Sequence, residues 1–468
     1  MPCPLDPSHS IFTRDLKRHL KICPKAKQAA VEAQLPCFRR NCNVDETCAQ
    51  VENPSYALEK GSTLRTSRGA LPSVERILSL INVIRKAYAM HAQPAIIPDP
   101  PATCDGEVQH TQEQSPSRGK KAEKHAMQHR GMLRELRTLC KGDESTVFVE
   151  LGAGNGGLTS AVCEWATTSS FILVDWAKPQ KAFDAALRGR GLSLARYKLD
   201  LRHFWMRGVP ELGWDSRAAC ASDTDVEKAS STDAGAPLMQ CTACDDDGKQ
   251  TASPTRVAIA KHLCGCATDF ALRSIVAAGT DGVPGAAGEG GKSIAGASVA
   301  THRTSGVDAV MIATCCHQKC TWATYVNRPF LEGLGIDEEA FALITLMSSW
   351  ATANEAGEEM REGNVLVSSG PAIGAGAPSV IADEPEEENE HAAAAEDRHD
   401  LSRLSQLVAG HEALGGGAAR RELGRMCKRL LDTGRMRFLE REGCFASTSM
   451  REYVSRTVTP ENVLLCAL

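Results

Sequence analysis

Five short apolar runs, each followed by a segment compatible with a helix, form the predicted core of this chain. They lie at residues 146–154 (TVFVELGAG), 170–177 (SFILVDWA), 195–201 (ARYKLDL), 256–265 (RVAIAKHLCG) and 307–316 (VDAVMIATCC). Apolar runs rich in β-branched residues that alternate with helices are typical of a parallel sheet covered on both faces. We therefore predict an α/β fold with a doubly wound sheet.

Two amphipathic segments flank these runs. The first, near 73–91, places apolar residues at helical spacing behind Ser73, which is suited to cap the helix, and predicts a packing helix. The second, at 419–443, has an apolar stripe beside a surface crowded with basic residues. A solvated amphipathic helix and an edge that faces phosphates both explain the second pattern, and the solvated helix is the simpler interpretation.

Four stretches have too little apolar content to build a core. They cover 99–119, 215–254, 279–305 and 357–400, and they are rich in Gly, Ala, Ser, Pro or acidic residues. We predict that they are disordered insertions. The remaining chain divides into a small module at 1–27, a linker at 28–119 that carries the packing helix, and an α/β domain at 120–468.

Composition restricts the class of protein. The chain has a net charge of -5, so any contact with nucleic acid must rest on local basic patches. Its 19 cysteines come with no signal-peptide pattern at the first residues and no apolar run of membrane-spanning length. We expect a reducing location, cytoplasmic or nuclear or both, and no association with membranes.

A glycine-rich turn follows the first run. Gly152, Gly154 and Gly156 lie between a predicted strand and helix, where missing side chains allow a ligand to approach the backbone. Asp175 ends the next strand, about 20 residues on, where a carboxylate can accept hydrogen bonds from ribose hydroxyls. The pattern predicts a site for a nucleotide-type cofactor.

Two cofactors suit such a turn, a nicotinamide dinucleotide and S-adenosylmethionine. The second carries a cationic sulfonium and an ammonium group, which favour an acidic neighbour. Glu150, just before the turn, supplies that acid, and Asp200, after the third run, can face the adenine. Asp200 can instead cap a helix. We interpret the turn as the cofactor site of a methyltransferase, with a dehydrogenase as the weaker alternative.

Ligands of open α/β sheets bind beyond the carboxyl ends of the strands. The end of the fourth run and the residues after it supply Lys261, His262, Cys264 and Asp269, and the end of the fifth run supplies Cys315 and Cys316, with His317 directly after it. We expect these side chains to line one crevice with the cofactor, with the cysteines as pocket wall. A zinc site formed by Cys315, Cys316, His317 and Cys320 is the alternative, because thiolates and imidazole at short spacing bind zinc.

The N-terminal module has the spacing of a structural zinc site. Its candidate ligands are Cys3, His9, His19 and Cys23, and the last two share one face of a predicted helix. Basic residues outnumber acidic ones in this segment, which points toward RNA or DNA as a partner.

Taken together, these motifs resemble a known family. They are similar to motifs of the eukaryotic tRNA ribose methyltransferases that modify the fourth nucleotide of the acceptor stem. The similar segments are CPLDPSH, RDLKRHLKIC, FVELGAGNGGLT, KHLCGCATDFAL, CCHQKC, MSSWAT and RELGRMCKRLLDTGR. The resemblance implies a Rossmann-fold class I methyltransferase domain, S-adenosylmethionine as cofactor, tRNA as substrate and an N-terminal CHHC zinc finger. Relatives commonly carry another cysteine- and histidine-containing finger before the CHHC module.

Methyl transfer to a ribose 2′-hydroxyl needs a base for its proton and a cation beside the developing alkoxide. We expect His262 or His317 to act as the base and Lys261 as the cation; either histidine can instead be a hydrogen-bonded wall residue. Two other functions remain open at this point. One is an RNA-binding protein with a non-catalytic methyltransferase fold, and the other is a nicotinamide-dependent oxidoreductase.

Overall fold

The computed structural model describes most of the predicted core. The described residues are 3, 10–45, 72–98, 120–177, 179, 182–214, 254–279, 306–352, 400–408, 410–411, 414, 416–443 and 445–468. The four predicted insertions lie outside them, apart from Pro254, Gly279 and Asp400, so the structure leaves their predicted disorder as a prediction.

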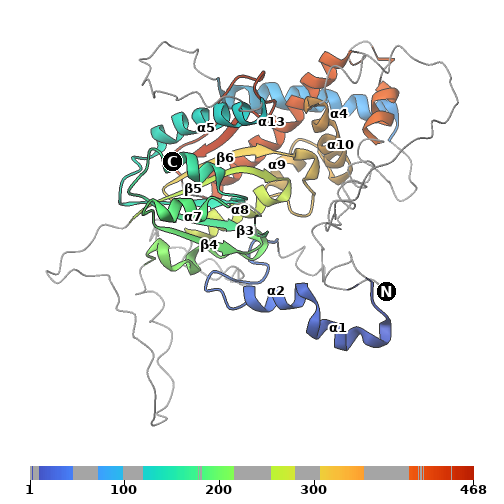
Figure 1. The fold of residues 1–468 in the computed structure, drawn as a ribbon. Coiled ribbons are helices and arrows are strands. Elements are labelled where there is room, and N and C mark those ends of the chain that lie inside the picture. Colours follow the sequence, from blue (N-terminus) through green and yellow to red (C-terminus); the bar gives the residue numbers. More distant parts are fainter. Residues whose placement is uncertain are drawn as a thin grey trace, which may run out of the picture.

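An eight-stranded mixed sheet forms the centre of the protein (Figure 1). Its strands are β1 (Ile96–Ile97), β2 (Thr146–Leu151), β3 (Ser170–Asp175), β4 (Leu194–Lys198), β5 (Thr255–Cys264), β6 (Ala309–Cys315), β7 (Thr448–Glu452) and β8 (Val463–Ala467). The spatial order is β1-β7-β8-β6-β5-β2-β3-β4. The five predicted runs thus form neighbouring parallel strands, and β8 enters antiparallel between β6 and β7. The predicted α/β class with a sheet rich in parallel pairs is confirmed.

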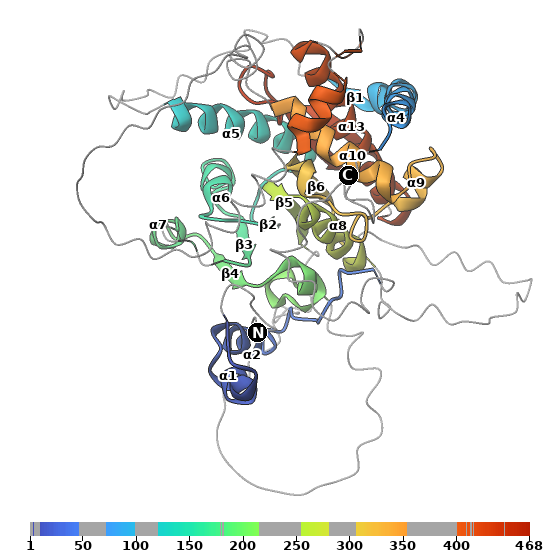
Figure 2. The same cartoon turned by 90° about the vertical axis from the view of Figure 1, so that its right-hand side faces the viewer.

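Helices cover both faces of the sheet (Figure 2). On one face α5 (Lys120–Leu139), α6 (Gly157–Val162) and α7 (Asp184–Gly189) pack against Phe148 and Phe171, whose rings stack. On the other face lies α8 (Cys266–Ala278), with the C-terminal part of α13 (Gly417–Glu442). Because β2 and β6 are buried along their whole length, their runs are continuously apolar apart from Glu150 and the short polar side chains.

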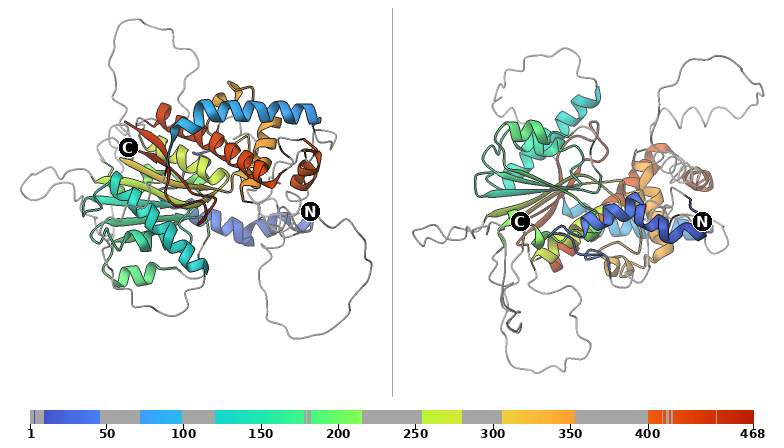
Figure 3. Two further views of the ribbon diagram at one scale, coloured as in Figure 1. Left: turned by 90° about the horizontal axis from the view of Figure 1, so that it is seen from above. Right: turned by 60° about the horizontal axis from the view of Figure 1, so that its bottom comes forward.

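A second core lies beside the sheet and consists of helices. It joins α4 (Val74–Ala87), α9 (Arg328–Glu332), α10 (Glu338–Ser348) and the N-terminal half of α13, and α4 runs alongside α13 (Figure 3). Ser73 caps α4, since its side chain accepts a hydrogen bond from the amide of Arg76. Trp350, the largest fully buried side chain, belongs to this core and donates its indole N–H to Ser405.

The structure corrects the interpretation of 419–443 as a solvated helix. Of the basic residues in α13, Arg420, Lys428 and Arg429 are buried, as is Arg435. They are neutralised internally: Lys428 pairs with Glu461, and Arg429 pairs with Asp432 at 2.7 Å. A basic sequence pattern does not show whether a helix surface faces water or buried carboxylates, because both environments stabilise the positive charges.

The N-terminal segment packs at the β4 end of the sheet. It contains α1 (Leu16–Ile22) and α2 (Pro24–Glu32). Lys198, the last residue of β4, donates from Nζ to Oε1 of Gln28 at 2.9 Å, and Nζ of Lys25 lies 5.7 Å from the ring centre of Trp176. The segment therefore lies beside the carboxyl ends of β3 and β4.

Short helical turns connect or precede several of these elements. They are η1 (Thr13–Asp15), η2 (Tyr88–Ala92), η3 (Gln93–Ala95), η4 (Leu201–His203), η5 (Met206–Gly208), η6 (Pro210–Leu212), η8 (His317–Lys319) and η9 (Ser349–Thr352). None of the described helices has both the length and the apolar composition of a transmembrane span.

Candidate active site

The turn between β2 and α6 is open to a ligand. Gly152, Gly154 and Gly156 have φ values of 67°, 50° and 83°, which glycine adopts without strain. A β-carbon placed on Gly154 would meet no other atom within 4 Å, whereas one on Gly152 would collide with Leu263. The space next to Gly154 therefore fits the approach of a cofactor to the backbone, while Gly152 is needed for packing.

Asp175 holds this turn in place. Its Oδ2 accepts a hydrogen bond of 2.7 Å from the amide of Gly154, and its Oδ1 accepts one of 2.9 Å from the amide of Ala177. The predicted ribose acid thus lies at the turn, as the sequence spacing indicates. Each carboxylate oxygen keeps a further lone pair, so the hydrogen bonds to the backbone leave room for hydroxyl donors.

Arg196 supports the turn from β4, a role that the sequence analysis missed. Its Nη1 donates to the carbonyl oxygen of Gly154 at 2.9 Å, and its Nε donates to Oδ2 of Asp184 at 2.6 Å. Hydrogen bonding to Arg196 lowers the pKa of Asp184. The sequence did contain a signal for this role. Arg196 stands between the less polar Ala195 and Tyr197 in β4, and a charged residue within a strand indicates a partner for its charge.

The two other acids predicted to contact the cofactor, Glu150 and Asp200, accept hydrogen bonds from other residues of the protein. Glu150 is buried and accepts hydrogen bonds from the amide of Thr159, at 3.0 Å, and from its hydroxyl. Burial raises the pKa of Glu150 to about 7, although the bonds from Thr159 oppose this shift. Asp200 accepts from the amide of Arg202 at 2.8 Å and caps η4, which is the alternative role considered above. Contacts of either acid with a cofactor stay predictions.

Lys261 lies between two histidines that the sequence analysis did not single out. Its Nζ is 2.9 Å from Nε2 of His129 and 3.3 Å from Nδ1 of His125, both on α5. Burial lowers the pKa of Lys261 to about 8, against the attraction of Glu150, and lowers the pKa of His129 to about 4. Two histidines four residues apart, on one face of a helix, were the signal available in the sequence.

His262 occupies an irregular position in β5. The pairing of β5 with β6 shifts register between Lys261 and Leu263, and His262 adopts a positive φ of 66° in this bulge. His262 as a whole residue is exposed, although partial burial of its imidazole lowers the pKa of this group. The ring lies edge-on to that of His125, with 6.3 Å between the ring centres. The bulge therefore directs His262 outward at the carboxyl edge of the sheet, beside Lys261.

The structure separates the residues of the segment 315–320. His317 is fully buried, and its Nε2 lies 2.8 Å from Oδ1 of Asp432. Cys320 is also buried and accepts a hydrogen bond from Nη2 of Arg435 at 3.1 Å. His317 thus lies in the core rather than in a crevice, and so does Asp269, whose carboxylate pairs with Arg435. The role of His317 as a base stays a prediction, and its burial speaks against it. The four-residue zinc site that includes His317 and Cys320 is not assembled.

Cys315 and Cys316 instead meet a cysteine from the neighbouring strand. Sγ of Cys264 lies 3.7 Å from Sγ of Cys315 and 3.2 Å from Sγ of Cys316. The three thiols stand at the carboxyl edge of the sheet, where the sequence analysis expected a pocket wall.

Three predicted ligands of the N-terminal zinc module converge. Sγ of Cys3 lies 3.9 Å from Sγ of Cys23 and 3.1 Å from Nε2 of His19. Ligands of a tetrahedral zinc ion with Zn–S bonds of about 2.3 Å lie about 3.8 Å apart, so the two thiols fit the ion. The fourth predicted ligand, His9, lies outside the described residues.

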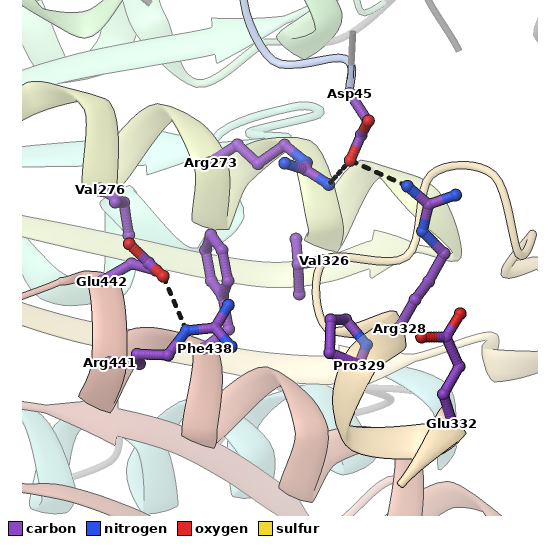
Figure 4. Close-up of a pocket in the computed structure, with 10 residues that line it drawn as sticks. All are labelled: Asp45, Arg273, Val276, Val326, Arg328, Pro329, Glu332, Phe438, Arg441 and Glu442. Atoms are coloured by element: carbon purple, nitrogen blue, oxygen red, sulfur yellow. Dashed lines mark hydrogen bonds and ion pairs between the residues drawn. The ribbon is translucent and has the colours of Figure 1, made fainter. Parts of the chain in front are cut away.

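A surface pocket of about 460 Å³ lies elsewhere, between α8, α9 and α13 (Figure 4). Inside it Asp45 accepts from Arg328 at 3.0 Å and from Arg273 at 3.5 Å, and Arg441 pairs with Glu442 at 2.7 Å. No residue of the glycine turn lines this pocket. The turn and the neighbouring strand ends therefore remain the candidate active site.

Comparisons with known proteins identify the family of the chain. The family described as methyltransferase TRM13 matches residues 126–468, and the U11-48K-like CHHC zinc finger matches residues 1–24. The tRNA:m(4)X modification enzyme TRM13 homologs of Homo sapiens and Mus musculus are 24% and 26% identical to the whole chain, which covers 86% and 85% of them. The Saccharomyces cerevisiae enzyme of that name is 24% identical over 75% of this chain and 71% of its own length. No solved structure matches the chain.

Proposed function

Because the chain belongs to the TRM13 methyltransferase family, we propose that it is the S-adenosylmethionine-dependent enzyme that methylates the ribose 2′-hydroxyl at position 4 of tRNA. The observation that carries the proposal is the match of the family over residues 126–468, which include strands β2 to β8, together with a glycine turn that is open at Gly154. The intact turn, held by Asp175, also argues against a non-catalytic RNA-binding protein, which would not need this geometry.

The order of the strands supports a Rossmann-like class I methyltransferase fold. Five parallel strands run β4-β3-β2-β5-β6, and the chain reverses its winding direction between β2 and β5. Ligands of such sheets bind outside the carboxyl ends of the strands, at the point of reversal. The glycine turn follows β2, and Lys261 and His262 end β5, so the candidate cofactor and substrate sites flank this point.

S-adenosylmethionine, when bound, supplies an electrophilic methyl group on a sulfonium. The residues that would hold it are those of the turn, with the backbone at Gly154 and the carboxylate of Asp175 facing the cofactor. In the proposed reaction the bound cofactor would give its methyl group to the 2′-oxygen and leave as the neutral thioether, and a base of this chain would take the hydroxyl proton.

We assign the base to His262 and the electrostatic role to Lys261. His262 is exposed at the bulge, so a ribose can reach its ring, whereas the buried His317 is inaccessible. Lys261 presents an ammonium group at the same strand end, and hydrogen bonds with His129 and His125 fix its direction. A positioned cation stabilises the negative charge that develops on the 2′-oxygen.

The N-terminal finger lies on the side of the sheet where a substrate would need to be held. The helix that directly follows its last predicted ligand, α2, contacts Lys198 through Gln28 and Trp176 through Lys25, beside the carboxyl ends of β3 and β4. Trp176 is 58% exposed and available to a nucleotide. We infer that a zinc-loaded finger contributes to tRNA binding next to the cofactor turn.

Methylation of unmodified tRNA by the purified protein tests the proposal. With radiolabelled methyl donor, the label should appear only at the ribose of nucleotide 4, located by nuclease mapping. Methylation of a base, or of another nucleotide, would contradict the proposed reaction. A loss of activity when S-adenosylmethionine is replaced by a nicotinamide cofactor separates the methyltransferase from an oxidoreductase.

A further inference from the structure

Three cysteines from two neighbouring strands converge at the edge of the sheet. Cys264 is the last residue of β5 and pairs with Cys315, the last residue of β6, while Cys316 follows directly. Cys264 is exposed, Cys316 is half-buried and Cys315 is buried. The group therefore extends from the protein interior to the solvent.

The bulge at His262 creates this group. If β5 paired regularly with β6, with His262 opposite Thr314, Cys264 would stand opposite Cys316, and its side chain would point to the face of the sheet that Ala258 and Ala260 occupy. The register shift places Leu263 on that face, where it joins the core, and turns Cys264 to the face of Cys315. The bulge in β5 thus decides which face of the sheet the thiol of Cys264 occupies.

Backbone strain is concentrated at the same place. Among the described residues other than glycine, only Asn41, His262 and Cys316 have a positive φ, and the values at His262 and Cys316 are 66° and 48°. Such conformations are strained for residues that carry a β-carbon. Two of the three strained residues therefore belong to the bulge or to the cysteine group.

The sulfur positions fit a metal ion. All three Sγ atoms lie within 4.8 Å of one another, and the pair Cys264 and Cys315 is 3.7 Å apart. This separation equals, within 0.2 Å, the 3.9 Å between the two thiols of the N-terminal finger. It also agrees with about 3.8 Å for two thiolates on one tetrahedral zinc ion. The 3.2 Å between Cys264 and Cys316 is shorter, yet far above the roughly 2.05 Å of a disulfide.

We propose that Cys264, Cys315 and Cys316 bind one zinc ion, with a fourth coordination position open to solvent. On binding, the three thiols release their protons to the buffer, and the resulting complex carries one negative charge. Lys319 and Lys428 lie close enough to Cys316 to interact with that charge. The site is separate from the N-terminal finger, and it does not depend on the proposed methyl transfer.

Zinc content tests this site in the full-length protein. Wild-type protein purified in reducing, metal-free buffer should contain about two zinc ions per chain, one in the finger and one in the cysteine group. The variant Cys264→Ser should lose about one, Cys23→Ser should lose the other, and the double variant should contain none. Cys140→Ser is the matched control, because this half-buried thiol donates to the carbonyl of Leu136 and lies in neither group.

Thiol reactivity provides a second measurement that needs no variant. In wild-type protein, alkylation of Cys264 and Cys316 should be slow and should accelerate at least tenfold when a chelator removes the metal, with Cys140 unaffected. A zinc content that Cys264→Ser leaves unchanged would overturn the proposal. So would a wild-type protein with zinc in the finger alone, whether its Cys264 and Cys316 are free thiols or form a disulfide found by mass spectrometry.

Discussion

The amide of Gly154 donates a hydrogen bond of 2.7 Å to the carboxylate of Asp175, which joins the glycine turn after β2 to the end of β3. This contact is between residues 21 positions apart in the chain, and it fixes the turn around open space. The position of the cofactor site can be tested at this point.

Gly154→Asp should abolish binding of S-adenosylmethionine and leave the fold intact. The new side chain would fill the space beside the turn, and aspartate is one of the residues that tolerates a positive φ. Titration calorimetry measures the binding, and thermal unfolding measures the fold. Gly191→Asp is the matched control, since Gly191 also has a positive φ and an open β-carbon position but lies between α7 and β4. Undiminished binding in folded Gly154→Asp protein would remove the turn as the cofactor site.

Lys261 should give methyl transfer an alkaline limit. Burial lowers its pKa to about 8, so the ammonium group loses its proton as the pH rises through about 8 and can no longer stabilise a negative oxygen. We expect kcat to fall above this pH in the wild type and at higher pH in Lys261→Arg. Lys261→Ala should lower kcat by about 10²-fold.

The affinity for S-adenosylmethionine in Lys261→Ala should change less than about twofold, because Lys261 is assigned to the substrate side of the site. A wild-type rate that stays level up to pH 10 would contradict the electrostatic role. His129→Gln, which keeps a polar side chain on α5, should lower kcat less than Lys261→Ala does.

Glu150 should make the protein less stable as the pH rises. Its pKa is about 7 in the folded state and near 4.5 in the unfolded chain, so the folded state binds the proton more tightly. This stabilising contribution is complete below about pH 4.5 and is lost as the pH rises through 7. Urea unfolding of wild type and Glu150→Gln from pH 5 to pH 8 measures it.

The difference in the free energy of unfolding between wild type and Glu150→Gln should change by up to about 3 kcal/mol from pH 5 to pH 8. The change should favour Glu150→Gln at high pH. Glutamine keeps an oxygen that can accept a hydrogen bond from the amide of Thr159. The comparison therefore measures the ionisation of Glu150 and not the loss of this hydrogen bond. A constant difference from pH 5 to pH 8 would show that Glu150 stays ionised in the folded protein.

The N-terminal finger should couple zinc to tRNA binding. Cys23→Ser removes one of three described ligands that converge, so it should lose about one zinc ion and raise the Kd for tRNA roughly tenfold at low salt. His9→Ala should weaken zinc binding in the same way if His9 completes the site. The affinity for S-adenosylmethionine should remain as in the wild type. A Cys23→Ser protein that keeps its zinc content and its affinity for tRNA would exclude a role of the finger in zinc-dependent tRNA binding.

His317→Ala should weaken the fold rather than the chemistry. His317 and Asp432 are both fully buried, and removal of the imidazole leaves the carboxylate with Arg429, Arg435 and Thr314 alone. We expect a loss of roughly 2–4 kcal/mol in the free energy of unfolding. Chemical denaturation measures it. The rate constant per folded molecule should be within a few-fold of the wild-type value, and a much slower rate at unchanged stability would return His317 to the active site.

The amino-acid sequence by itself determined the parallel strands, the glycine turn and the spacing of the N-terminal ligands. Each is a local property: β2 and β6 are buried along their length and therefore apolar, Gly154 needs a positive φ, and His19 and Cys23 share one face of a helix. Asp175 was found because its partner is a turn of known geometry at a known distance in sequence.

The tertiary structure decided which polar residues meet. Lys261 contacts His129 across 132 positions, and His317 contacts Asp432 across 115, and no periodicity in the sequence records either pair. The burial of Lys428 and Arg429 in α13 depends on carboxylates that the fold brings to them. The single extra residue in β5 turns Cys264 toward Cys315, because side chains alternate along a strand and a shift of one residue exchanges the faces.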